Sequence, residues 1–261
     1  MPFTLSHAAA AIPFRRTPLI MSAIVMGCFA PDFPYFLSLS PRTFFGHTFA
    51  GMFIFDLPLA IAALWLFHAL IKQPMLMFLP TGIRRRLTTG VNTFPFWPLK
   101  RLSLIVLSVL IGTATHLLWD SFTHRNSWTY QNWAFLRESV ELPVSGEMQM
   151  YNLLEYACSI LGLAVLAVWI WHWYRTTNPS AAPITLPVDA AQRRALVAVL
   201  PVLTTLGGAL RAYHDNGIHL QIRPIMHFMV DTLISAIVFF LLGLFIYGVI
   251  LRQHRRAPVK V

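Results

Sequence analysis

Histidine and aspartate side chains recur at four-residue intervals near one end of a long apolar stretch. His116, Asp120 and His124 stand at positions i, i+4 and i+8 in the segment THLLWDSFTH. Each four-residue step turns an α-helix by about 40°, so the three side chains share one helical face. Their imidazole nitrogens and carboxylate oxygens are donors that suit zinc and other divalent metals. The spacing therefore predicts metal ligands.

Further imidazoles and carboxylates accompany other apolar stretches. His227 and Asp231 repeat the four-residue spacing, and His47 precedes a stretch that contains Asp56. A carboxylate inside a membrane costs about 2.5–3.5 kcal/mol on insertion scales, so an acid in such a position points to function. Half of the ten acidic residues lie within or at the end of an apolar stretch: Asp32, Asp56, Asp120, Glu155 and Asp231.

The elements that must position these groups are long and apolar. Of the 261 residues, 56% are hydrophobic and 11% are charged, whereas soluble domains carry roughly 25% charged residues. About 20 helical residues cross the hydrocarbon of a bilayer. We therefore expect an all-α integral membrane bundle of five to six transmembrane helices, forming one domain over 1–261. The apolar stretches are 18–30, 48–71, 102–122, 153–174, 195–213 and 225–251.

Basic residues gather in the connections between the apolar stretches. The net charge is +10, and the positive-inside rule explains this placement without a nucleic-acid partner. It predicts that 72–101, 175–194 and the C-terminus are cytoplasmic and that 123–150 and 211–224 face outward. Residues 176–192 then form a short cytoplasmic linker, and the lipid bilayer is the main partner.

This topology brings the unusual polar groups to one depth. His116, Asp120 and His124 lie at the outer end of their stretch, and Asp32 and His47 flank the outer start of 48–71. Glu155, His227 and Asp231 also fall at outer ends, and Asp56 alone is deeper. We therefore expect imidazoles and carboxylates from several helices to meet near the outer interface.

Four motifs follow one another in the first half of the chain: MPFTLSHAAA, APDFPYFL, GHTFAGMFIFDLPL and LIGTATHLLWDSFTH. Together they resemble an uncharacterised bacterial multi-pass membrane family, a domain of unknown function, similar in motif order to the LexA-regulated inner-membrane metal-dependent hydrolases. The resemblance covers roughly 1–150. It implies a protein of the bacterial cytoplasmic (inner) membrane. It also implies one polar site made of His7, Asp32, His47, His116, Asp120 and His124.

The position of His7 constrains the N-terminal topology. If 18–30 crossed the membrane, His7 and Asp32 would lie on opposite sides. About 13 helical residues span only about 20 Å, which is too short to cross. We therefore favour a re-entrant hairpin, in which 4–14 and 18–30 are two short helices that return to the same face.

These patterns support a membrane-embedded metal-dependent hydrolase that acts at the outer face on a lipid or lipid-linked phosphoester. It would hold one or two divalent ions, most simply zinc, and use Asp32 or Asp56 as general base. Glu155, His227 and Asp231 would support the ligands through hydrogen bonds. Two alternatives stay open. One is a proton or metal-ion transporter, and the other is a non-catalytic membrane protein whose polar cluster fixes helix packing.

Overall fold

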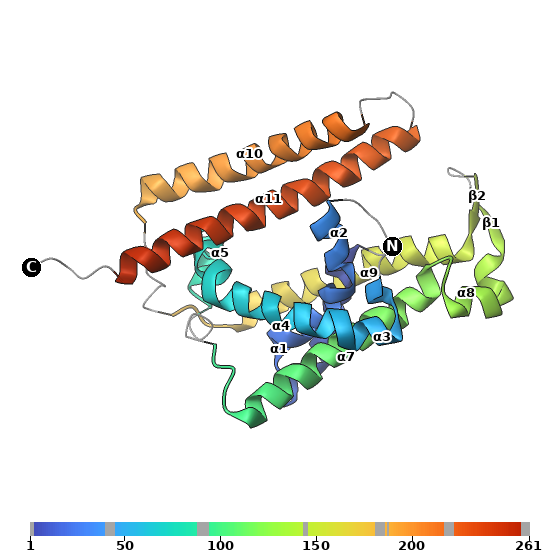
Figure 1. Cartoon of the computed structure of the whole chain (residues 1–261), viewed down its shortest axis with the longest axis horizontal. Coiled ribbons are helices and arrows are strands. Elements are labelled where there is room, and N and C mark those ends of the chain that lie inside the picture. Colours follow the sequence, from blue (N-terminus) through green and yellow to red (C-terminus); the bar gives the residue numbers. More distant parts are fainter. Residues whose placement is uncertain are drawn as a thin grey trace, which may run out of the picture. The chain divides into compact units, whose positions relative to one another are not determined.

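A computed structural model describes residues 3–39, 45–87, 94–142, 146–180, 186, 188–216 and 222–256. Nearly all of its regular structure is helical (Figure 1). Among these residues, five helices are long and apolar enough to cross a membrane. The predicted all-α, multi-pass membrane architecture is thus confirmed. The candidate spans are Phe49–Met75, Leu99–Asn132, Met150–Thr176, Ala190–Asp215 and Ile225–Gln253.

Each candidate span covers nearly all of one predicted apolar stretch, and its ends differ from the predicted ones by up to ten residues. The predicted stretch 18–30 is not among the candidate spans. The first candidate span is a run of short segments: α3 (Phe49–Gly51), η4 (Met52–Asp56), α4 (Leu57–Leu66), η5 (Phe67–Ile71) and α5 (Lys72–Met75). The other helices are α6 (Thr81–Arg84), α7 (Leu99–Thr123), α8 (Trp128–Asn132), α9 (Met150–Thr176), α10 (Ala190–Asn216) and α11 (Ile222–Arg256). Parts of the predicted linker 176–192, parts of the predicted loops and the C-terminal end lie outside the described residues.

The chain forms two compact units. The first comprises Met1–Phe33, Phe44–Leu64 and Pro95–Thr176, and the second comprises Pro34–Thr43, Trp65–Phe94 and Thr177–Val261. The expected single membrane domain stays a prediction. All six residues of the predicted metal site belong to the first unit.

The N-terminal residues of the first unit form two short helices packed against each other. These are η1 (Thr4–Arg16), a 3-10 helix, and α1 (Met21–Phe29). Ala11 of η1 and Ile24 and Cys28 of α1 form a buried apolar cluster. Neither helix is among the candidate spans, so this is the helix pair expected for the N-terminal hairpin.

Helices α1 and α7 cross in backbone contact. A Cβ atom at Gly27 would collide with the carbonyl of Val109, and one at Gly112 would collide with the carbonyl of Ile24. Such small-residue crossings are typical of helix pairs in membranes. The hydroxyl of Thr113 donates to the Gly27 carbonyl at 3.2 Å, which adds a polar link. The crossing therefore fixes the register of α1 on α7.

Other segments carry the remaining site residues or complete the first unit. In the first unit, η2 (Ala30–Asp32) follows α1, and η3 (Phe45–His47) precedes α3. Between them, α2 (Phe33–Ser38) belongs to the second unit from Pro34 onward. After α8 come η6 (Ala134–Arg137) and a hairpin of β1 (Ser139–Leu142) and β2 (Gly146–Gln149), in which Ser139 pairs with Gln149. The sequence patterns did not predict this hairpin.

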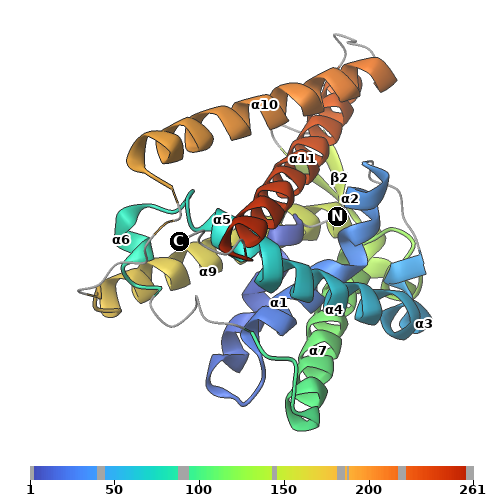
Figure 2. The same cartoon turned by 60° about the vertical axis from the view of Figure 1, so that its left-hand side comes forward.

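In the second unit, α10 and α11 run side by side (Figures 1 and 2). Gly208 allows close contact, because a Cβ atom there would lie 2.7 Å from the Thr232 carbonyl. Nη1 of Arg211 donates to the Ser235 hydroxyl at 3.2 Å, and Nη2 pairs with Asp215 at 2.7 Å. Arg211 therefore links α10 to α11 through Ser235 and pairs with Asp215 within α10.

Candidate metal centre

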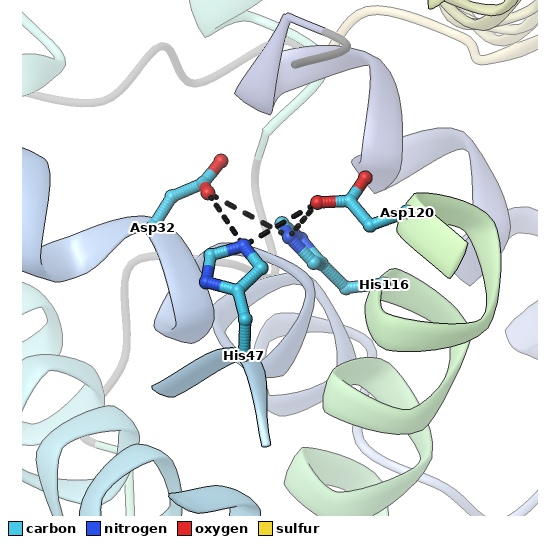
Figure 3. A group of neighbouring side chains, drawn as sticks. All are labelled: Asp32, His47, His116 and Asp120. Atoms are coloured by element: carbon cyan, nitrogen blue, oxygen red, sulfur yellow. Dashed lines mark ion pairs between the residues drawn. The ribbon is translucent and has the colours of Figure 1, made fainter. Parts of the chain in front are cut away.

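Four side chains from three parts of the first unit converge on one point (Figure 3). Asp32 ends η2, His47 ends η3, and His116 and Asp120 lie one turn apart on α7. One donor atom from each of the four residues lies within 4.8 Å of those from the others. We call Asp32, His47, His116 and Asp120 the donor quartet. It is a buried cluster that can hold a metal ion.

The separations within the donor quartet match a coordination site. Nε2 of His47 lies 3.5 Å from Asp32 Oδ1 and 3.3 Å from Asp120 Oδ2. Nε2 of His116 lies 3.6 Å and 3.1 Å from the same two oxygens. Donors at about 2.0–2.1 Å from a tetrahedral zinc ion are about 3.4 Å apart. Three of the four distances exceed the usual 2.7–3.2 Å of an N–H···O hydrogen bond.

Two further histidines border the quartet. Nε2 of His7 lies 3.3 Å from Asp120 Oδ1, and Nε2 of His124 lies 3.6 Å from Asp120 Oδ2. The rings of His7 and His116 stack with their centroids 3.9 Å apart. The structure thus brings together all six predicted ligands. It places His7 and Asp32, from the two ends of the N-terminal hairpin, on the same site.

Hydrogen bonds with residues outside the donor quartet orient its metal-donor atoms. Nδ1–H of His116 donates to the Cys28 carbonyl at 2.6 Å, so Nε2 faces the site. The hydroxyl of Thr4 donates to Asp32 Oδ2 at 2.6 Å, which leaves Oδ1 toward His47 and His116. Such contacts orient metal ligands and set their tautomers. The sequence patterns predicted neither partner.

Burial leaves several donor atoms without a hydrogen bond. The side chains of Asp32, His116 and Asp120 are at most 5% exposed. Nε2 of His116, Oδ1 of Asp32 and both carboxylate oxygens of Asp120 have no hydrogen-bond partner. Unsatisfied polar groups in such surroundings are costly. A bound cation would satisfy these lone pairs at once, so the residues fit a metal ion.

Residues 1–252 match a family described as a domain of unknown function, DUF4184. The chain belongs to the DUF4184 family. The match extends well beyond the first 150 residues on which the four motifs lie. No curated protein and no solved structure matches the chain. The bacterial source and the likeness to the LexA-regulated hydrolases stay predictions.

The two histidines of the site that lie outside the candidate spans have opposite pKa shifts in this DUF4184 protein. Burial, together with the neighbouring His116, lowers the pKa of His7 to about 4. Burial also disfavours charge on His47, but the carboxylates of Asp120 and Asp32 outweigh it and raise the pKa to about 9. Without a metal, the carboxylates of the site therefore favour the protonated, positively charged form of His47.

Asp56 lies beside the donor quartet without belonging to it. Its side chain is fully buried, and neither carboxylate oxygen has a hydrogen-bond partner. A Cβ atom at Gly46 would lie 2.8 Å from Asp56 Oδ1, so the carboxylate reaches the backbone just before His47. Asp56 ends η4, a π-helical turn, and such turns are frequent at functional sites.

The three predicted supporting residues are not linked to the quartet by the contacts described above. Glu155 is half-buried on α9, one turn before Ser159, whose hydroxyl accepts the Phe3 amide at 2.9 Å. It therefore lies on the side of α9 that meets the N-terminal hairpin. His227 is exposed and Asp231 is half-buried on α11, in the second unit. The supporting roles of all three stay predictions.

Proposed function

We propose that this membrane protein is a metal-dependent hydrolase whose donor quartet binds one divalent ion. The observation that carries the proposal is the set of four nitrogen–oxygen separations of 3.1–3.6 Å among buried donors. A purely structural polar cluster would close these distances into hydrogen bonds and leave few lone pairs empty. We propose zinc as the ion, because imidazole nitrogens and carboxylate oxygens are donors that zinc prefers, and a catalytic zinc with four such ligands would take water as a fifth.

Different residues of the chain would have different roles around the ion. The bound ion would act as a Lewis acid and lower the pKa of a water molecule. Asp56 would accept a proton as general base, because its buried oxygens have no hydrogen-bond partner and lie against the segment that carries His47. His7 and His124 would hold the Asp120 carboxylate in place from its two oxygens.

The surroundings of the site favour an amphiphilic substrate. His47 and His124 are its most exposed members, with side chains 17% and 21% exposed. Phe45 and Phe49, on either side of His47, are 51% and 79% exposed. A polar head at His47 and an apolar chain along these rings would suit a lipid or lipid-linked phosphoester. An ion-transport role is less well supported, since 102–115 of α7 contain no ionisable side chain.

We place the site at the outer face of the bacterial inner membrane, with the C-terminus cytoplasmic, as the distribution of basic residues favours. Cysteine accessibility tests this orientation. With Cys28 and Cys158 replaced by serine, Tyr130→Cys should react with an impermeant maleimide in intact cells, and Arg85→Cys should not. Labelling of Arg85→Cys alone would reverse the topology.

Metal content and hydrolysis, measured on the same purified protein, test the proposed function. The wild type should carry about one zinc per chain and cleave p-nitrophenyl phosphoesters or phospholipid vesicles. A chelator should abolish cleavage, and zinc should restore it. Asp56→Asn should keep the metal but lose about 100-fold or more in rate, the usual range for a general base. Glu141→Gln, an exposed matched control, should leave both unchanged. Cleavage that persists in the metal-free protein would refute the proposal.

A further inference from the structure

The second unit gathers arginines from two segments distant in sequence. Arg84, Arg85 and Arg86 follow one another at the end of α6 and just beyond it, and Arg193 and Arg194 lie in the first turn of α10. We call these five residues the arginine cluster. The positive-inside rule explains so many arginines in cytoplasmic connections. It does not explain why the arginines of α6 and those of α10 lie close together.

Hydrogen bonds hold the two segments together. Nε of Arg193 donates to the Met77 carbonyl at 2.8 Å, and Nη2 donates to the Leu79 carbonyl at 3.1 Å. Nε of Arg86 donates to the Thr177 carbonyl at 2.8 Å. The connection before α6 and the start of α10 are thus fixed to each other.

The described parts of 65–87 and 177–194 contain one acidic residue, Asp189. Its Oδ1 accepts the Ala191 and Gln192 amides at 2.8 Å as the cap of α10. Arg84 is half-buried and its Nε has no hydrogen-bond partner. Burial and the nearby charge of Arg193 lower the pKa of Arg84. These neighbouring cations would be stabilised by an anion between them.

The location of the cluster indicates what that anion is. The candidate span Phe49–Met75 ends nine residues before Arg84, and the span from Ala190 begins three residues before Arg193. The cluster therefore lies near the ends of two candidate spans, which is where lipid headgroups are expected. Guanidinium groups form bidentate hydrogen bonds with phosphate, and Lys/Arg clusters next to a membrane span are typical of anionic-lipid binding.

We propose that the arginine cluster of the second unit binds the phosphate group of an anionic phospholipid. The site is separate from the donor quartet and takes a structural lipid rather than a substrate. The phosphate would bridge Arg84 and Arg193 and receive further donors from the exposed side chains of Arg85 and Arg194. It would thereby stabilise the contact between α6 and α10.

Lipid binding to the full-length protein in detergent tests this proposal. Native mass spectrometry should show that phosphatidylglycerol binds the wild type in preference to phosphatidylcholine. Arg85→Gln with Arg194→Gln should weaken phosphatidylglycerol binding at least about tenfold, since each basic residue near a membrane surface contributes severalfold. Both side chains are exposed, so the double variant should fold. Arg84→Gln alone should also lower the thermal stabilisation that phosphatidylglycerol gives.

Arg15→Gln with Arg16→Gln is the matched control, because it removes two adjacent exposed arginines of the first unit. It should change phosphatidylglycerol binding less than twofold. An equal loss in the control would refute the proposal, because binding would then follow net charge. Inorganic phosphate at millimolar concentration separates the two sources of phosphate. If it stabilises the protein as well as the lipid does and displaces it, the site takes a free anion and the lipid assignment is wrong.

Discussion

Helices α7 and α11 carry the same His-x-x-x-Asp spacing in apolar sequence, yet they differ in what surrounds it. His116 and Asp120 on α7 have side chains 0% and 5% exposed and meet Asp32 and His47. On α11, His227 is exposed and Asp231 is half-buried. Spacing puts two donors on one helical face, but only a partner segment that brings more donors makes a site.

The partner of α7 is the N-terminal hairpin. Glycines at the crossing let α1 lie against α7, and this contact brings the Cys28 carbonyl to His116. In the second unit, the polar groups described between α10 and α11 bond to each other, as Arg211 does with Ser235. Close contact between α1 and α7 therefore brings donor groups together, whereas close contact between α10 and α11 holds two candidate spans against each other.

The largest difference should appear in metal content. His116→Ala with Asp120→Ala should lower bound zinc from about one per chain to less than about a tenth, since two of four ligands are lost. His227→Ala with Asp231→Ala removes the same side chains at the same spacing and should leave zinc unchanged. Elemental analysis of the purified proteins measures both. Equal metal in all three proteins would show that the donor quartet is not the ligand set.

The helix crossing gives the next largest effect. Gly112→Ala should lower the free energy of unfolding by about 2 kcal/mol, because the added methyl group meets backbone atoms of Ile24 and Cys28. Gly207→Ala on α10 meets only the Phe239 ring and should cost much less. Denaturant titration in mixed micelles measures both. Zinc affinity should fall in Gly112→Ala alone, and a loss of affinity in Gly207→Ala would break the comparison.

A smaller effect is expected from the orientation of Asp32. Thr4→Val removes the hydroxyl that donates to Asp32 Oδ2 and should weaken zinc binding about tenfold, as loss of such a contact usually does. Thr17→Val, at the turn of the same hairpin, removes a hydroxyl that donates to the Phe14 carbonyl and accepts the Leu19 amide, away from the donor quartet. It should bind zinc like the wild type. Competition with a chromogenic chelator gives the affinities.

The smallest effect concerns a single polar link between α1 and α7. The Ser108 hydroxyl accepts the amide of Ile20 at 2.9 Å, so Ser108→Ala should lower the free energy of unfolding by about 1 kcal/mol. Ser103→Ala, five residues earlier on the exposed side of α7, should have almost no effect. Similar values for the two variants would mean that the Ser108–Ile20 hydrogen bond adds nothing measurable to stability.

The sequence patterns predicted the spans and, together with the family resemblance that added His7, the six side chains that the structure brings together; their role as ligands stays a prediction. Long apolar runs identify spans directly, and helical spacing identifies the face of α7. The Cys28 carbonyl could not be predicted, since every residue has one and only the α1–α7 register selects it. Thr4 could be suggested only weakly, by its position three residues before His7 in the motif MPFTLSHAAA. The π-helical turn at Asp56 and the β1–β2 hairpin depend on tertiary contacts that periodicity does not encode.

The donor quartet spans residues 32 to 120 of the chain, and this separation has a consequence for biogenesis. During synthesis, His7 and Asp32 emerge first, and they wait for α7 to enter the bilayer before a cation can be caught. Under the proposed function, binding of an ion would close these long loops at once, as a cross-link would. All four donors precede α9, α10 and α11 in the chain, so the ligand set would be complete before those helices are made.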